Sequence, residues 1–168
     1  GIIRNHYVGR TFIEPAQSIR QFGVKLKHNA NSSAIKGKKV ALIDDSIVRG
    51  TTAKKIIKMI YDAGATEVHL GIACPPITHP DFYGIDTPNQ EELIAAKKSI
   101  DEINNEIGST SLFFLSLNGT YKALGEETRD KSNPQFTDHC FTGEYPTSLD
   151  DKDKGAVSNQ FSLLSETS

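Results

Sequence analysis

An amphipathic helix pattern between two buried-strand patterns constrains the fold of this chain more than any other feature. Residues 38–43 (KKVALI) contain an apolar run that is too short for a helix and does not alternate with polar residues. Such a run is typical of a strand buried on both faces of a parallel sheet. Residues 53–63 place isoleucines at helical spacing, Gly64 can end that helix, and residues 67–74 form a second apolar run. This strand–helix–strand order predicts an α/β fold with parallel strands.

The residues before and after this strand–helix–strand unit have weaker secondary-structure patterns. Residues 1–37 are basic and are expected to be mostly loop, with a short helix that opens at Pro15. Residues 89–107 have the apolar spacing of one amphipathic helix. Beyond it we expect a strand over 112–117 and a short helix over 119–124. From residue 125 onward the composition turns polar.

Length and charge restrict the class of protein. The 168 residues fit one domain with a tail, and a hydrophobic fraction of 37% can supply a core. The net charge of −2 argues against a protein that binds by general neutralisation of nucleic-acid phosphates. No run approaches the roughly 18 apolar residues of a membrane span. Cys74 and Cys140 are too few for a disulfide scaffold, so we expect a cytoplasmic protein with no nucleic-acid or membrane partner. Because the chain begins with Gly1 rather than Met, we expect it to be the C-terminal part of a longer protein.

The segment 40–52 (VALIDDSIVRGTT) carries the predicted chemistry. Its buried strand ends in two carboxylates, Asp44 and Asp45, and a loop with hydroxyl groups and one glycine leads into the helix. Ligands of open α/β sheets bind at the carboxyl ends of strands, and a helix N-terminus attracts anions. Two acids beside an anion site indicate a phosphorylated ligand that also carries hydroxyl groups or a hard cation such as Mg²⁺.

Each of these residues also has a purely structural interpretation. A single aspartate at either position could form a turn or cap a helix, and Thr51 and Thr52 could cap the helix that follows. Arg49 could be a solvated loop residue. The functional interpretation depends on the combination, because adjacent carboxylates repel one another and cost stability when they have no partner.

The same stretch resembles the phosphoribosyl pyrophosphate (PRPP) motif of type I phosphoribosyltransferases, an apolar strand followed by two acids and a small-residue loop. Its exact form over 44–52, DDSIVRGTT, is similar to the glutamine PRPP amidotransferase family, the amidophosphoribosyltransferases. Three further stretches support this resemblance: RNHYVGRTFIEP at 4–15, PPITHPDFYGID at 75–86 and CFTGEYP at 140–146.

The resemblance implies a type I phosphoribosyltransferase fold, a parallel sheet flanked by helices, present as a partial domain with a C-terminal extension. Residues 1–124 would be the C-terminal part of that domain, with a flexible loop at 1–15 and the PRPP loop at 40–52. Residues 125–147 would be a C-terminal segment of the family, and residues 148–168 a polar, disordered tail.

The implied reaction transfers ammonia, released from glutamine in a separate N-terminal domain, to PRPP in the first step of purine synthesis. The two acids would serve the ribose hydroxyls and Mg²⁺, the loop would hold the 5-phosphate, and the segment 1–15 would close over PRPP. The implied catalytic residues are Asp44, Asp45, Arg10 and Tyr7, and the implied metal ligands are Asp44 and Asp45. The implied PRPP-binding residues are Asp44, Asp45, Ser46, Ile47, Val48, Arg49, Gly50, Thr51, Thr52 and Arg4.

Some members of this family carry an iron–sulfur cluster held by cysteines, and here three of those positions are Asp81, Thr137 and Cys140. One thiolate cannot hold a cluster that needs four cysteine ligands, so we expect no cluster. We expect Cys140 to be a small buried apolar residue. A replacement metal site formed by Asp81, His79 and His139 is the less favoured alternative.

Nothing in the chain matches the family's glutaminase domain, so we expect no glutamine hydrolysis by this segment, which is expected to be inactive alone. The resemblance implies a homo-oligomer that is inhibited by purine nucleotides. Two alternatives are another type I phosphoribosyltransferase and a non-catalytic PRPP-sensing module. The first would not explain the stretches at 4–15 and 140–146, and the net charge of −2 counts against a DNA-binding regulator.

Overall fold

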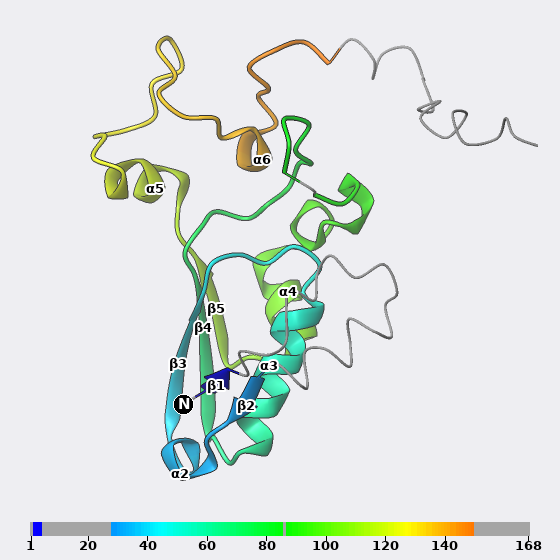
Figure 1. Ribbon diagram of the computed structural model, residues 1–168, viewed down its shortest axis with the longest axis vertical. Coiled ribbons are helices and arrows are strands. Elements are labelled where there is room, and N and C mark those ends of the chain that lie inside the picture. The colour runs from blue at the N-terminus through cyan, green and yellow to red at the C-terminus, as the bar shows by residue number, and fades with distance from the viewer. Residues whose placement is uncertain (1, 5–27, 86, 150–168) are drawn as a thin grey trace, which may run out of the picture.

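The computed structural model describes residues 2–4, 28–85 and 87–149 (Figure 1). The predicted helix at Pro15, most of the predicted flexible loop 1–15, and nearly all of the predicted tail 148–168 lie outside these residues.

A three-stranded parallel sheet forms the centre of the fold, as the sequence predicts. Its strands are β3 (Lys39–Asp44), β4 (Glu67–Ile72) and β5 (Ser111–Phe114), in the order β3-β4-β5. Because the strands are parallel, their carboxyl ends meet at one edge, where the loops and short helices at the top of Figure 1 are gathered.

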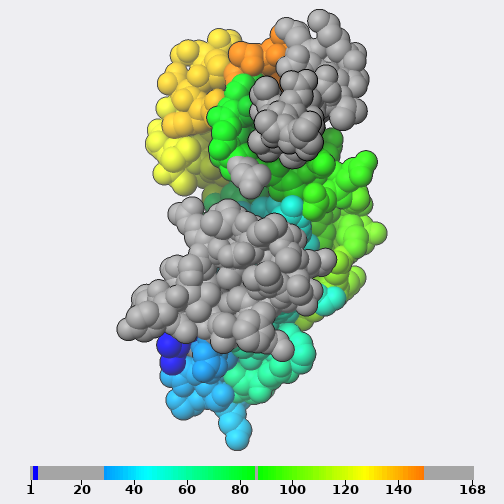
Figure 2. All heavy atoms as spheres, turned by 45° about the vertical axis from the view of Figure 1, so that its right-hand side comes forward, coloured from blue at the N-terminus to red at the C-terminus, as the bar shows by residue number. Residues whose placement is uncertain are grey.

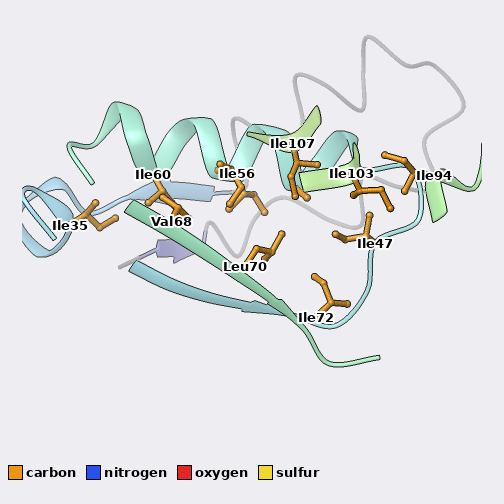
Figure 3. Packing of buried hydrophobic residues seen from close by; sticks show 12 residues of the cluster. Ile35, Ile47, Ile56, Ile60, Val68, Leu70, Ile72, Ile94, Ile103 and Ile107 are labelled. Atoms are coloured by element: carbon orange, nitrogen blue, oxygen red, sulfur yellow. The ribbon is translucent and has the colours of Figure 1, made fainter. Parts of the chain in front are cut away.

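Helices α3 (Thr51–Asp62) and α4 (Ile100–Ile107) cover one face of the sheet. The apolar side of α3 packs on the inward side chains of β4, which are fully buried at Val68 and Leu70 (Figure 3). Burial of a large aliphatic side chain contributes about 1.5–3 kcal/mol, so this layer holds the fold together. The buried cluster consists of Ile35, Ile47, Ala53, Ile56, Ile57, Ile60, Val68, Leu70, Ile72, Ile94, Ile103 and Ile107.

The prediction that the first strand is buried on both faces is wrong for β3. Its side chains alternate between exposed and half-buried, and Ile43 is 66% exposed. In the described part of the chain the helices cover one face only, so Ile43 and Phe113 remain open on the other. Gly71 lies between them, and a Cβ there would be 2.5 Å from the Phe113 ring, so a larger residue could not stand between these two side chains.

The single helix predicted over 89–107 is also wrong. The structure has two short 3₁₀ turns, η1 (Gln90–Glu92) and η2 (Ile94–Ala96), before α4 begins. A tertiary bond interrupts the helical pattern, because the Ile94 N–H donates to the Val48 carbonyl at 2.9 Å. Ser99 then starts a new helix through a capping box with Glu102.

The basic N-terminal segment is less loop-like than predicted. Strands β1 (Ile2–Arg4) and β2 (His28–Ala30) pair antiparallel, and a short helix, α2 (Ser32–Ile35), precedes β3. The side chain of Asn31 caps α2 by accepting from the Ser33 N–H at 3.2 Å.

Two short helices follow the sheet, α5 (Leu117–Ala123) and α6 (His139–Thr142). A buried ion pair joins the polar segment between them to α6. Arg129 binds Asp138, whose carboxylate also accepts from the Tyr121 hydroxyl at 2.9 Å. None of the helices in the described residues is both long and apolar enough to cross a membrane.

Candidate functional site

The carboxyl end of β3 presents the two predicted acids at the edge of the sheet. Asp44 is the last residue of the strand, and its carbonyl accepts from the Ala73 N–H at 2.9 Å, which ties it to the end of β4. The side chain of Asp44 accepts from the Asp45 N–H at 3.0 Å, and Asp45 accepts from the Ser46 hydroxyl at 2.9 Å. Local hydrogen bonds therefore orient the two carboxylates, and Asp45 is exposed.

The loop that follows is anchored on both sides. Ile47 is 3% exposed and packs into the core near Ile94 and Ile103 (Figure 3). Arg49 forms an ion pair with Glu92, with an Nε to Oε2 distance of 2.8 Å. These contacts hold the loop against the turns η1 and η2 while its backbone remains at the edge of the sheet.

Helix α3 begins directly after the loop without a side-chain cap. Gly50 occupies the N-cap position with φ of 75°, in the left-handed region, and within the described residues α3 has no side-chain cap. The first N–H groups of a helix have no intrahelical acceptor, so they are available to an anion. Thr51 and Thr52 are exposed and bring hydroxyl groups to the same position.

Cys74 lies close enough to the two acids for their charges to act on its thiol, although no motif surrounds it in the sequence. Burial raises the pKa of its thiol to about 11, with further contributions from the charges of Asp45 and Asp44. The thiol is therefore neutral at physiological pH and adds no charge to the site. Cys74 stands two residues after β4, at the carboxyl end of a parallel strand. That position in the sequence could have identified it as a neighbour of the two acids.

The structure thus brings together most of the predicted loop residues, but not all of their side chains are exposed to a ligand. The Ile47 side chain is in the core, so only its backbone could contact a ligand. Arg10 and Tyr7 lie outside the described residues. The backbone of Arg4 pairs with His28, and its side chain lies outside the described part.

The positions at which some family members carry cluster cysteines do not fit an iron–sulfur cluster. Asp81 and Cys140 do lie together, with 4.0 Å between Oδ2 and Sγ. Both cysteines of the chain are within the described residues, and Cys74 lies instead beside Asp44 and Asp45. A set of four cysteine ligands is therefore not available from this chain. Cys140 is half-buried and faces a carboxylate, which differs from the buried apolar setting predicted for it.

Gly50→Ala is expected to destabilise the loop by about 1–2 kcal/mol, because an L-residue is strained at this φ. The new Cβ would also be 3.0 Å from Ile94 Cδ1. Gly37→Ala is the matched control, since Gly37 has a φ of 73° and nothing within 4 Å of an added Cβ. Thermal unfolding should show a larger loss for Gly50→Ala. Equal losses of stability in the two variants would show that the contact with Ile94 adds nothing to the strain of the positive φ.

The parallel sheet, its flanking helices and the acid-bearing loop define a partial type I phosphoribosyltransferase fold. No protein-family model matches the chain. Curated amidophosphoribosyltransferases are similar to it, with 59% identity to that of Rhizobium etli over 98% of this chain and 33% of the relative. The Bacillus subtilis enzyme is 52% identical over 89% of this chain and 31% of the relative.

A solved structure gives the same result. Glutamine PRPP amidotransferase from Bacillus subtilis, complexed with ADP and GMP, has a TM-score of 0.74 and 52% identity, over 89% of this chain and 32% of that one. The chain is therefore homologous to the C-terminal part of the amidophosphoribosyltransferases, and it spans about a third of the length of these relatives.

Proposed function

We propose that this chain supplies the PRPP-binding loop of an amidophosphoribosyltransferase and that the complete protein converts PRPP and ammonia to 5-phosphoribosylamine and pyrophosphate. The observation that carries the proposal is the junction between β3 and α3. There, two oriented carboxylates are followed directly by a helix start that has no side-chain cap. The names of the homologues support the choice of this reaction.

In this proposal the loop binds the 5-phosphate of PRPP. The N–H groups at the start of α3 and the hydroxyls of Ser46, Thr51 and Thr52 donate to the phosphate oxygens. Gly50 supplies the positive φ that turns the loop into α3, and it has no Cβ to press against Ile94. Ile47 acts only through its backbone, and Arg49 shapes the loop through Glu92.

Asp44 and Asp45 bind the ribose hydroxyls and hold Mg²⁺ with PRPP. Carboxylate oxygens at an exposed edge are the ligands that Mg²⁺ prefers, so these residues fit that ion. An ion held by these residues would supply positive charge to the pyrophosphate leaving group. Arg4, Arg10 and Tyr7 would complete the site from the segment 1–15, which lies outside the described residues.

The chemistry proposed is a displacement at C1 of the ribose. The nitrogen of ammonia forms the new bond, the bond from C1 to the pyrophosphate oxygen breaks, and the nitrogen then loses a proton to solvent. The sugar becomes positively charged as the leaving group departs, and the carboxylates at the sheet edge stabilise that charge. Positioning and electrostatics supply the rate enhancement, rather than a general base.

The partners of the complete protein follow from the same proposal. Glutamine is the source of ammonia through a domain that this chain does not contain, and purine nucleotides act as inhibitors. The solved relative with bound ADP and GMP supports nucleotide binding. We also infer a homo-oligomer in the cytoplasm.

The test is an assay of pyrophosphate release by the complete protein, with PRPP, Mg²⁺ and ammonium as the only substrates. We expect one pyrophosphate per PRPP consumed, with a rate that depends on ammonium concentration. Release that requires a nucleobase instead of ammonia would identify another type I phosphoribosyltransferase. PRPP binding without turnover would indicate a sensing module.

A further inference from the structure

A second group of reactive side chains lies where the loop after β4 meets the C-terminal segment. The N–H groups of Thr78 and His79 both donate to the Cys140 carbonyl, at 2.9 and 3.1 Å. The Tyr145 hydroxyl donates to the Pro80 carbonyl at 2.8 Å. Figures 1 and 2 show α6 and this loop packed together at one end of the molecule.

Asp81, His139 and Cys140 bring three kinds of metal ligand together at this junction. One ligand atom from each residue lies within 4.8 Å of the other two. The Asp81 and His139 side chains are only 3% and 4% exposed. An oxygen, a nitrogen and a sulfur donor at this spacing suit Zn²⁺ and are poor ligands for Mg²⁺ or Ca²⁺.

The hydrogen bonds of the protein leave this group incompletely satisfied. His139 Nε2 is 2.7 Å from Asp81 Oδ2, but Nδ1 is buried and has no partner among the described residues. The rings of Tyr83 and Tyr145 pack on the imidazole at centroid distances of 5.0 and 5.1 Å. A buried nitrogen without a partner, in a ring held by two aromatic neighbours, points to an ion or a water that completes the site.

The contacts of Asp81 leave one carboxylate oxygen facing the other two residues. Oδ1 accepts from the N–H groups of Tyr83 and Ile85 at 2.7 and 2.9 Å, while Oδ2 lies 2.7 Å from His139 Nε2 and 4.0 Å from Cys140 Sγ. Coordination of a divalent cation releases the proton of a cysteine thiol, so a thiolate and a carboxylate would together balance the charge of the ion.

We propose that Asp81, His139 and Cys140 bind one Zn²⁺ ion, through a carboxylate oxygen, an imidazole nitrogen and a thiolate, with solvent in the fourth position. The ion would join the loop after β4 to α6, in addition to the hydrogen bonds and ring contacts that already connect these two segments. This proposal does not depend on the proposed transferase function.

The test is a Co²⁺ titration of the complete, chelator-treated protein, followed by absorption spectroscopy. We expect saturation at one Co²⁺ per chain, a near-ultraviolet thiolate-to-cobalt band, and loss of both signals when Zn²⁺ is added. No band, or a band that does not saturate at one equivalent, would overturn the proposal. This measurement on the unchanged protein decides the matter even where a variant fails to fold.

Variants then assign the ligands. Cys140→Ser is expected to remove the near-ultraviolet band, and His139→Gln to weaken Co²⁺ binding at least about tenfold. Cys74→Ser and His69→Gln are the matched controls and should leave both signals unchanged. Cys74 is a strict control because it lies beside Asp44 and Asp45, the other place where a thiol and carboxylates meet. A band that persists in folded Cys140→Ser, or that disappears in Cys74→Ser, would contradict the proposed site.

Discussion

Replacement of both acids at the end of β3, Asp44→Asn with Asp45→Asn, is expected to reduce ammonia-dependent turnover of PRPP at least about a hundredfold in the complete protein. The substitution keeps the size of each side chain but removes the two charges that would stabilise the developing positive charge on the ribose. The measurement is the initial rate of pyrophosphate release at saturating ammonium. Glutamine hydrolysis measured in the absence of PRPP should be unaffected, because this chain contains no part matching the glutaminase.

The matched control also removes two negative charges, but from positions away from the end of β3. Asp62→Asn with Asp101→Asn alters two acids in the helices α3 and α4, at positions outside the loop between β3 and α3. This variant should retain turnover within about twofold, since both acids are exposed and neither is in the loop. The loss of the Lys58–Asp62 ion pair and of Asp101 from the first turn of α4 is expected to cost at most about 1 kcal/mol each. Similar losses in the two double variants would mean that net charge, rather than the acids at the strand end, governs the rate.

Asp138→Ala is expected to destabilise the C-terminal part of the fold by about 2–3 kcal/mol. Asp138 is 7% exposed, and its carboxylate accepts from Arg129, the Tyr121 hydroxyl and Thr142. Its removal would leave the Arg129 side chain, which is 15% exposed, with Glu144 as its remaining ion-pair partner, and it would take the acceptor from the buried Tyr121 hydroxyl. Hydrogen exchange should show amides of α5 opening about a hundredfold more often. Glu127→Ala, at an exposed position nearby, should change exchange little.

The same carboxylate gives the direction of a pH dependence. Burial would raise the pKa of Asp138, but hydrogen bonds from Arg129 and Tyr121 lower it below the ordinary value of 3.8. The ionised form therefore stabilises the fold at all pH values above about 4, and this contribution is lost as the pH falls through the lowered pKa. Asp138→Asn should flatten the acid side of the stability profile. An unchanged acid side would show that other carboxylates determine it.

The sheet could be predicted because its signals are local. The apolar run that became β3, the isoleucine spacing of α3 and the stop at Gly64 all act within a few residues, and each element formed close to its predicted place. The helix predicted over 89–107 was wrong because the bond from Ile94 to Val48 joins residues 46 positions apart. No periodicity in the sequence carries that information.

The candidate site was predictable for the same reason, and its surroundings were not. The acids, the loop and the helix start are consecutive residues, so their order alone places them at one edge of the sheet. The position of Cys74 beside the acids depends on the pairing of β3 with β4, and the contact of Asp81 with His139 joins segments 58 residues apart. Such contacts follow from the tertiary fold, which composition and spacing do not specify.

The most direct test of the proposed PRPP site is isothermal titration calorimetry of PRPP with Mg²⁺ into the complete protein, with the Asp44→Asn, Asp45→Asn variant measured in parallel. The loop between β3 and α3 predicts one PRPP bound per chain by the unchanged protein, and at least about a tenfold weaker affinity in the folded variant. Equal PRPP affinity in the two proteins would contradict the assignment of these acids. Absence of PRPP binding by the folded, unchanged protein would contradict the assignment of the loop itself.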